Sequence, residues 1–297
     1  MTSKEAAAAH RAEEKRLRDT IRDASTDVQV RLAAQRDLAD LWRRGGDYRR
    51  AGLLFALTMQ AAKSQPHPDG PLHASICNQW GVLGKYTGDF ERSERLYRQA
   101  LDVFASTYGS RHDTVATVCH NLGGLAHARG DHAAGEPWAR RAVEIRARLH
   151  GPDHPRTAED RAAWAALLEG CGRLDEAATE LGRALNTFRR VHGAEHYEIA
   201  VATHNLAALD HRRGNLADAI DSYTRALALK EKLLGPTHPD LATTTLNLAT
   251  AHRQQHQPHQ AILLYSRTIA ILTSRVHPAH PTLQAAHHGL RQTVTPT

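Results

Sequence analysis

Aromatic residues, cysteines and long apolar runs are all scarce in this chain. Phe, Trp and Tyr make up 5% of the 297 residues, and there are three cysteines. An odd, small number of cysteines in a long chain argues against a disulfide framework and for a reducing compartment. No apolar run approaches the roughly 18 residues that a membrane-spanning helix needs. Residues 1–10 lack the apolar core of a signal peptide. We therefore expect a cytoplasmic protein.

Motifs that carry catalysis are missing as well. The chain has no serine in a nucleophile elbow, no glycine-rich phosphate loop and no dinucleotide fingerprint. Gly123-Gly124 is interpreted as a helix-packing pair. Cys77, Cys119 and Cys171 are expected to be buried small hydrophobic residues, because free cysteine usually behaves that way. The sequence thus predicts no catalytic residue and no cofactor, and we expect that the protein is not an enzyme.

No segment alternates with period two, so no strand is expected, but a different period is plain. A turn glycine recurs every 42 residues, at Gly46, Gly88, Gly130, Gly172 and Gly214. His256 stands at the sixth place in this series. Self-similarity at such a period indicates a solenoid, in which each unit buries its apolar face against its neighbours.

The third copy shows how one unit is built. Apolar residues spaced by three and four predict a helix over 113–128, and Gly130-Asp131 supplies a helix end followed by an N-cap. A second helix is expected to run to about Leu149 and to stop at Gly151-Pro152. Each unit is therefore an antiparallel helix pair, and the fold is all-α.

Small and large residues alternate at fixed places in the units. On the first helix a small residue recurs where two helices must cross closely: Ala39, Gly81, Gly123, Ala165, Ala207 and Ala249. On the second helix a large residue recurs as Phe55, Tyr97, Tyr223 and Tyr265, with Ala139 and Leu181 as smaller substitutes. Large-into-small packing is expected to form the core.

These positions resemble the tetratricopeptide repeat, and the 42-residue spacing is similar to its kinesin-light-chain type. The residues that carry the resemblance are Asn205-Leu206-Ala207-Ala208-Leu209, Asn247-Leu248-Ala249, and the linker Leu234-Gly235-Pro236-Thr237-His238-Pro239. The resemblance implies a right-handed superhelical solenoid of about six units plus capping helices. We expect a capping helix at 1–24, the repeat array at 28–280, and a closing helix with a frayed tail at 281–297.

An asparagine series is the strongest functional signal. Gln79, Asn121, Asn205 and Asn247 occupy one position of the first helix. In the resembled family this position faces the concave groove, where amides bind the backbone or terminal carboxylate of a peptide. An amide offers donors and an acceptor, so it can pair with any extended chain. The alternative is that the asparagines belong to the repeat and form hydrogen bonds within it.

Basic and polar residues are expected beside this series on the same helix face. One neighbouring position holds Asn78, His120 and His204; another holds Arg43, Lys85, His127, His211 and Arg253, interrupted by Glu169. The groove is thus predicted to be basic to neutral, and an acidic or carboxylate-bearing protein or peptide fits it. The alternative is an ordinary solvated helix face.

The histidines raise the question of a metal site. His150/His154 and His192/His196 have i, i+4 spacing, but His112, His154, His196, His238 and His280 recur in every linker. A residue repeated in each linker indicates a packing element, so no metal is expected.

The leading hypothesis is a non-enzymatic scaffold or adaptor that binds a protein or peptide in its groove. The composition suggests a bacterial source, where such repeats often form the sensor part of a regulatory system. One alternative is an enzyme or enzyme accessory that uses the groove histidines. Another is weak nucleic-acid binding, suggested by the net charge of +6, although clustered basic residues and aromatic stacking platforms are missing. An apolar end of the stack could pair with a second copy.

Overall fold

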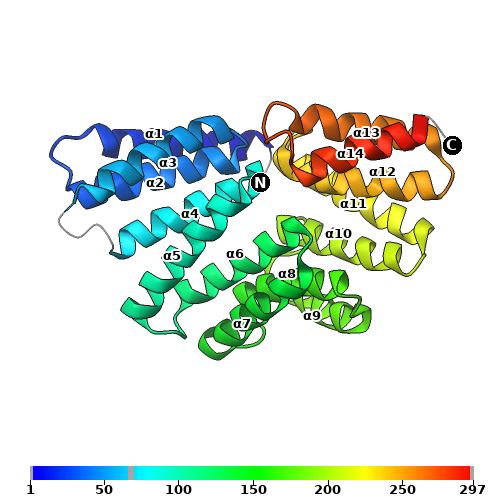
Figure 1. The fold of residues 1–297 in the computed structure, drawn as a ribbon, viewed down its shortest axis with the longest axis horizontal. Helices are drawn as coiled ribbons and strands as arrows, with labels where there is room; N and C mark the ends of the chain where they lie inside the picture. Colours follow the sequence, from blue (N-terminus) through cyan, green and yellow to red (C-terminus); the bar gives the residue numbers. More distant parts are fainter. Residues whose placement is uncertain (1–2, 66–69, 295–297) are drawn as a thin grey trace. The chain divides into compact units, whose positions relative to one another are not determined.

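The computed structural model describes residues 3–65 and 70–294, and within these ranges every regular element is a helix. The all-α prediction is therefore confirmed. The elements are α1 Ser3–Arg22, α2 Val28–Arg44, α3 Tyr48–Lys63, α4 Pro71–Thr87, α5 Phe90–Tyr108, α6 Asp113–Arg129, α7 His132–His150, α8 Pro155–Gly170, α9 Leu174–His192, α10 Tyr197–Arg212, α11 Leu216–Leu234, the short 3₁₀ helix η1 Pro239–Leu241, α12 Ala242–Gln254, α13 Pro258–Leu272 and α14 Pro281–Val294 (Figure 1).

The chain divides into two compact units, residues 1–121 and 122–297, and each is described by itself. In unit 1, α2 pairs with α3 and α4 pairs with α5, while α1 packs on α2. Leu17 of α1 is buried against Leu38 and Leu41. The charged first helix therefore covers the apolar side of the first helix pair.

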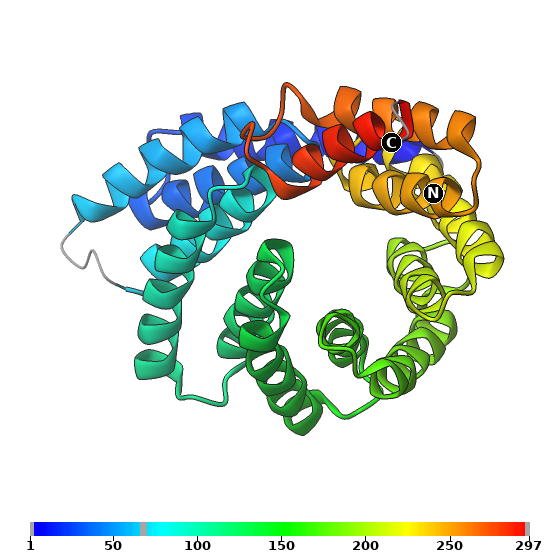
Figure 2. The same cartoon turned by 45° about the vertical axis from the view of Figure 1, so that its right-hand side comes forward.

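Unit 2 contains three consecutive helix pairs, α8/α9, α10/α11 and α12/α13 (Figure 2). The first helices of these pairs also touch one another, α8 with α10 and α10 with α12. The closing helix α14 packs on α13 and α12 and reaches Val294; the predicted frayed tail beyond it lies outside the described residues. Residues at equivalent positions of the three first helices thus become neighbours in space.

The turn between the two helices of a pair has the predicted chemistry. The glycine that ends the first helix is left-handed, with φ of 88° at Gly88 and 77° at Gly130. His256 takes the same conformation, with φ of 58°, which confirms it as the glycine equivalent of the last pair. The aspartate after the glycine caps the second helix, as where Asp131 accepts from the backbone N–H of Ala134 at 3.3 Å.

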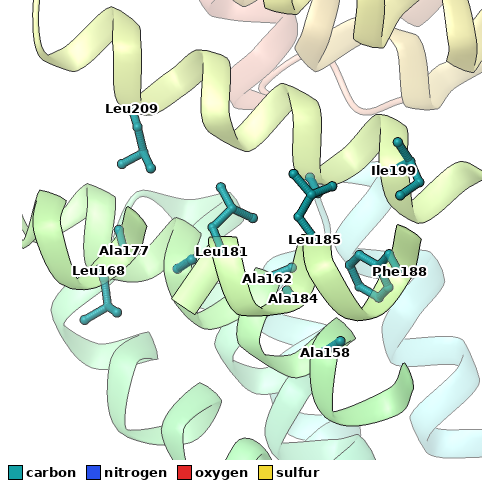
Figure 3. Close-up of a cluster of buried hydrophobic side chains, with 12 residues drawn as sticks. Ala158, Ala162, Leu168, Ala177, Leu181, Ala184, Leu185, Phe188, Ile199 and Leu209 are labelled. Atoms are coloured by element: carbon teal, nitrogen blue, oxygen red, sulfur yellow. The ribbon is translucent and has the colours of Figure 1, made fainter. Parts of the chain in front are cut away.

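The large-into-small packing is clearest between α4 and α5. Tyr97 is fully buried, and a Cβ atom added to Gly81 would lie 2.7 Å from its ring. Glycine is therefore required at that crossing, whereas alanine fits the equivalent place at Ala207. In unit 2, Phe188 and Leu181 lie among the small residues Ala158, Ala162 and Ala184 (Figure 3).

The recurring linker histidines cap the helices that follow them. In each case the ring Nδ1 accepts the backbone N–H of the residue two places on, at 3.2–3.3 Å: His112, His154, His196, His238 and His280. An Nδ1 that accepts a hydrogen bond carries no proton, so these caps need the neutral ring. The i, i+4 histidine pairs are stacked rings, with centroids 3.9 Å apart at His192/His196.

We expect the free energy of unfolding to decrease as the pH is lowered, because these caps need neutral rings. Burial lowers the pKa of His196 and of His280 below the ordinary value. Below about pH 6.5 the unfolded chain therefore binds more protons than the folded one, and each such histidine lowers the free energy of unfolding as the pH falls. The double variant His196→Asn/His280→Asn keeps a capping side chain and removes both titrating rings.

Denaturant unfolding at about pH 7.5 and about pH 5.5 measures the effect. The double variant should lose less stability between the two conditions than the parent protein. His259 is exposed on α13, so His259→Asn is the matched control and should leave the pH dependence unchanged. An equal loss in the double variant and the parent would contradict the prediction.

Candidate functional site

One amide of the asparagine series, Asn121, bonds to the neighbouring first helix in unit 1. Asn78 and Asn121 are both buried, and the Asn121 Nδ2 donates to the Asn78 Oδ1 at 2.8 Å. These two positions lie 43 residues apart, so the bond joins α4 to α6. Gln79, beside Asn78 on α4, is half-buried. The two buried amides therefore use part of their hydrogen-bonding capacity inside the protein.

The same kind of contact recurs in unit 2. The Asn205 Nδ2 on α10 donates to the Ala162 carbonyl on α8 at 3.4 Å, again across 43 residues. The Asn247 side chain on α12 lies near the Tyr223 hydroxyl on α11 and lowers the pKa of that hydroxyl, against the larger effect of burial. Both amides are half-buried, so part of each remains open to solvent. The internal hydrogen bonds correspond to the alternative that asparagine serves the repeat itself.

His204 on α10 packs its ring beside Tyr223 and is neutral at pH 7, so it does not add a positive charge to the predicted groove. Its Nδ1 is buried without a hydrogen-bond partner, and its ring centroid lies 5.2 Å from that of Tyr223. Burial lowers the pKa of His204 well below the ordinary value, and the nearby Lys230 and His127 add to this. Burial likewise raises the pKa of the Tyr223 hydroxyl. At neutral pH neither side chain contributes charge to this face.

The three first helices of unit 2 carry a set of polar side chains, which we call the polar face of unit 2, and two pairs of them are in contact across helices. The Arg212 Nε on α10 lies 3.2 Å from the Glu169 Oε1 on α8, and the His211 Nε2 lies 2.7 Å from the Gln254 Oε1 on α12. Burial raises the pKa of Glu169, and Arg212 opposes this shift. The face is defined by Glu169, Asn205, His211, Arg212, Asn247, Arg253 and Gln254.

The other predicted site residues lie elsewhere. In unit 1 the Arg43 guanidinium and the Lys85 ammonium lie 5.4 and 5.1 Å from the centroid of the Tyr86 ring. His120 on α6 is half-buried. His127 is exposed in unit 2, with its ring 5.1 Å from that of His132. Arg253 is half-buried, and its Nε has no hydrogen-bond partner.

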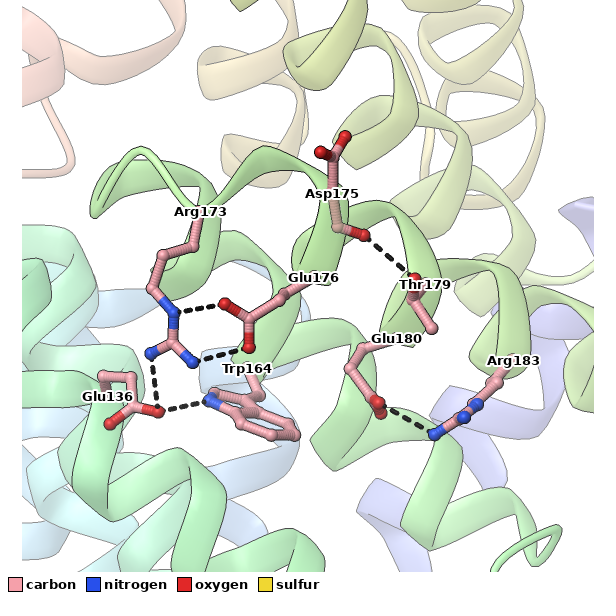
Figure 4. Close-up of polar contacts among 8 residues, drawn as sticks. All are labelled: Glu136, Trp164, Arg173, Asp175, Glu176, Thr179, Glu180 and Arg183. Carbon is pink, nitrogen blue, oxygen red and sulfur yellow. Dashed lines mark hydrogen bonds and ion pairs between the residues drawn. The ribbon is translucent and has the colours of Figure 1, made fainter.

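Sequence reasoning missed a second polar cluster around Trp164. The Trp164 Nε1 on α8 donates to the Glu136 Oε1 on α7 at 3.0 Å, and the Arg173 Nη1 lies 3.3 Å from the same oxygen (Figure 4). Arg173 also forms a bidentate pair with Glu176 at 2.7 Å. Glu136 recurs once at the 42-residue interval, as Glu94, but its contact is with a tryptophan 28 residues later, and only that spacing could have indicated it.

Three further features of the described ranges concern possible metal ligands, the apolar length of the helices and the cysteines. No group of three or more His, Cys, Asp or Glu side chains there could hold a metal ion. Nor is any described helix both long and apolar enough to cross a bilayer. Cys77 and Cys119 are buried as predicted, but the prediction was wrong for Cys171, which is exposed where α8 ends and the turn begins.

Models of the tetratricopeptide repeat match residues 72–134, 160–232 and 198–274, and a second model of the same repeat matches residues 115–156. These ranges cover more than half of the chain. The chain is a tetratricopeptide repeat protein. Members of this repeat class generally mediate protein interactions and are typically non-enzymatic. No curated protein sequence matches the chain.

Several solved structures are similar to this chain. A Rap protein complexed with competence and sporulation factor has 13% identity and a TM-score of 0.70, covering 96% of this chain and 88% of its own. BtubC (BKLC) from P. vanneervenii has 21% identity and a TM-score of 0.50, covering 82% and 91%. The TPR-like repeats of a putative kinesin light chain from Podospora anserina have 20% identity and a TM-score of 0.48, covering 71% and 98%.

Proposed function

We propose that this protein is a non-enzymatic scaffold that binds an acidic protein or peptide on the polar face of unit 2. The observation that carries the proposal is that successive first helices contact each other through polar side chains 43 residues apart, as in Glu169–Arg212 and His211–Gln254. Such contacts place amides, imidazoles and guanidinium groups side by side along three helices. An extended chain could meet them one after another.

The available groups favour a carboxylate-bearing partner. Arg253 has an unpartnered Nε, and the half-buried Asn205 and Asn247 amides keep hydrogen-bonding capacity beyond the contacts they make inside the protein. A guanidinium with adjacent amide donors suits a carboxylate better than a cation. The similar Rap protein was crystallised with competence and sporulation factor, which supports a regulatory role in which a ligand is sensed. Within that proposal, this chain acts in the cytoplasm of a bacterium.

The test is selection from a random peptide library displayed on phage, followed by calorimetry with the selected peptides. We expect enrichment of acidic sequences. The double variant His211→Ala/Arg253→Ala should bind them at least about tenfold more weakly, because it removes charge-assisted hydrogen bonds worth roughly 1.5–3 kcal/mol.

Arg225→Ala is the matched control for the loss of a cation. Arg225 is exposed on the second helix α11 and pairs only with its neighbours Asp221 and Ser222 in the described residues. This variant should leave affinity unchanged. If the double variant binds as tightly as the parent, or if Arg225→Ala weakens binding equally, the polar face of unit 2 is not the binding site.

A further inference from the structure

Unit 1 contains a cavity of about 540 Å³ between α3, α4 and α5, away from the asparagine series. Part of its lining is apolar, from Met59, Leu96 and Val103, and part is cationic, from Lys63, Arg92 and Arg95. Trp80 of α4 also lines it. A cavity with an apolar wall and a few convergent charged groups has the usual character of a small-ligand site.

Two hydrogen-bond donors at this cavity are buried without an acceptor. They are the Trp80 Nε1 and the Arg92 Nε. The Arg92 guanidinium lies over the indole ring, 5.2 Å from its centroid, and its Nη2 lies 2.9 Å from the Asp89 Oδ2. A buried N–H without a partner is costly and rare, so two at one place call for an explanation.

Comparison with the equivalent tryptophan two repeats later explains why the Trp80 N–H has no acceptor. Trp164 lies 84 residues after Trp80, and its indole N–H donates to the Glu136 carboxylate (Figure 4). The residue 84 positions before Glu136 is Gly52 on α3. Unit 1 thus keeps the tryptophan but has no side chain where unit 2 has the carboxylate that accepts its hydrogen bond.

The charges around Trp80 also favour an anion from outside. Arg92 stands at the position that Glu176 has in unit 2. Lys63 and Arg95 line the cavity and have no carboxylate partner among the described residues, and Asp102 is the acidic residue in the lining. The lining is therefore net positive beside two unpartnered donors.

We propose that this cavity binds a ligand with a carboxylate on an apolar body, and that the carboxylate takes the place of the missing Glu136 side chain. Lys63 and Arg95 are exposed, so they meet the carboxylate first. Arg92 then pairs with it, and as the Arg92 side chain moves off the ring the Trp80 N–H donates to the same group. The apolar body lies along Met59, Leu96 and Val103. This site is separate from the polar face of unit 2 and goes beyond the proposed function.

The test uses two matched probes, 4-phenylbutyrate and 4-phenylbutyramide, which differ in the carboxylate alone. Binding is followed by calorimetry and by the indole N–H resonance of Trp80 in NMR, assigned with Trp80→Phe. We expect the acid to bind at one site and to shift the Trp80 resonance downfield, and the amide to bind at least about tenfold more weakly. A peptide with a C-terminal phenylalanine, free or amidated, distinguishes a peptide terminus from a small free acid as the natural source.

Gly52→Glu supplies the missing carboxylate from the protein itself. A Cβ at Gly52 would meet the Leu83 Cδ2 at 3.5 Å, an ordinary contact, so the side chain can be accommodated. This variant should show the shifted Trp80 resonance without ligand and should lose binding of the acid. Arg92→Gln is the second variant and should weaken binding of the acid about tenfold.

The outcome is independent of the polar face of unit 2. His211→Ala/Arg253→Ala should bind the acid as the parent does, so failure of one proposal does not imply failure of the other. Equal binding of acid and amide, no binding of the acid in the millimolar range, or full affinity in both Gly52→Glu and Arg92→Gln would overturn the inference.

Discussion

Asp160→Ala should lower the free energy of unfolding by about 3–5 kcal/mol, because it removes the carboxylate that faces a buried arginine. The Arg146 Nη1 on α7 lies 3.2 Å from the Asp160 Oδ1 on α8, and the two side chains are 6% and 0% exposed. A guanidinium at this depth that has lost its carboxylate must either keep an uncompensated charge or open the packing between α7 and α8. Denaturant unfolding followed by circular dichroism measures the loss.

The neighbouring repeat indicates how the loss can be reversed. Phe188 and Ala202 occupy the positions 42 residues after Arg146 and Asp160, and both are fully buried. The double variant Arg146→Phe/Asp160→Ala should therefore recover most of the stability, since apolar replacement of a buried pair is often neutral or stabilising. A double variant as unstable as Asp160→Ala would show that the site cannot accept the apolar arrangement.

Phe188→Ala should cost about 3–5 kcal/mol, the usual range for deleting a buried phenylalanine. Phe188 is fully buried with Leu185, Ala184 and Ile199, so its removal leaves a cavity between α9 and α10 that rigid helices fill poorly (Figure 3). Thermal or denaturant unfolding gives the value.

Val191→Ala is the control on the same helix. Val191 is 48% exposed, and its truncation should change stability by less than about 0.5 kcal/mol. Similar losses in the two variants would mean that helix α9 is weakened as a whole, and the assignment of Phe188 to the core would be wrong.

The 42-residue period could not predict which side chains pack between the second helix of one repeat and the first helix of the next. Buried charged or polar pairs alternate with apolar ones along the chain: Phe104/Val118, Arg146/Asp160, Phe188/Ala202, Lys230/Thr244 and Leu272/Ala286. The Lys230 Nζ donates to the Thr244 Oγ1 at 2.9 Å, and burial lowers the pKa of Lys230. From the sequence, a charged residue whose equivalents in other repeats are apolar would be predicted to be solvent-exposed. Its burial depends on a polar partner on another helix, which the repeat pattern does not reveal.

For the asparagine series too, the sequence shows where the amides recur but not what they bond to. Its recurrence was visible in the sequence, and so was the small residue two places after each amide. Whether an amide faces solvent or a neighbouring helix depends on contacts 43 residues apart, such as Asn121–Asn78. The tryptophan at 80 and 164 is equally ambiguous, because its acceptor Glu136 in one repeat is Gly52 in the other.

The sequence by itself determined the repeat length, the helix pairs, the left-handed turns and the small-residue crossings, because each depends on residues a few positions apart. The tertiary structure alone decided which polar groups are paired across helices, which remain open on the polar face of unit 2, and where unit 1 has donors without an acceptor. The physical reason is that a buried hydrogen bond needs two partners, and in a repeat protein the second partner belongs to another repeat, where the residue type varies.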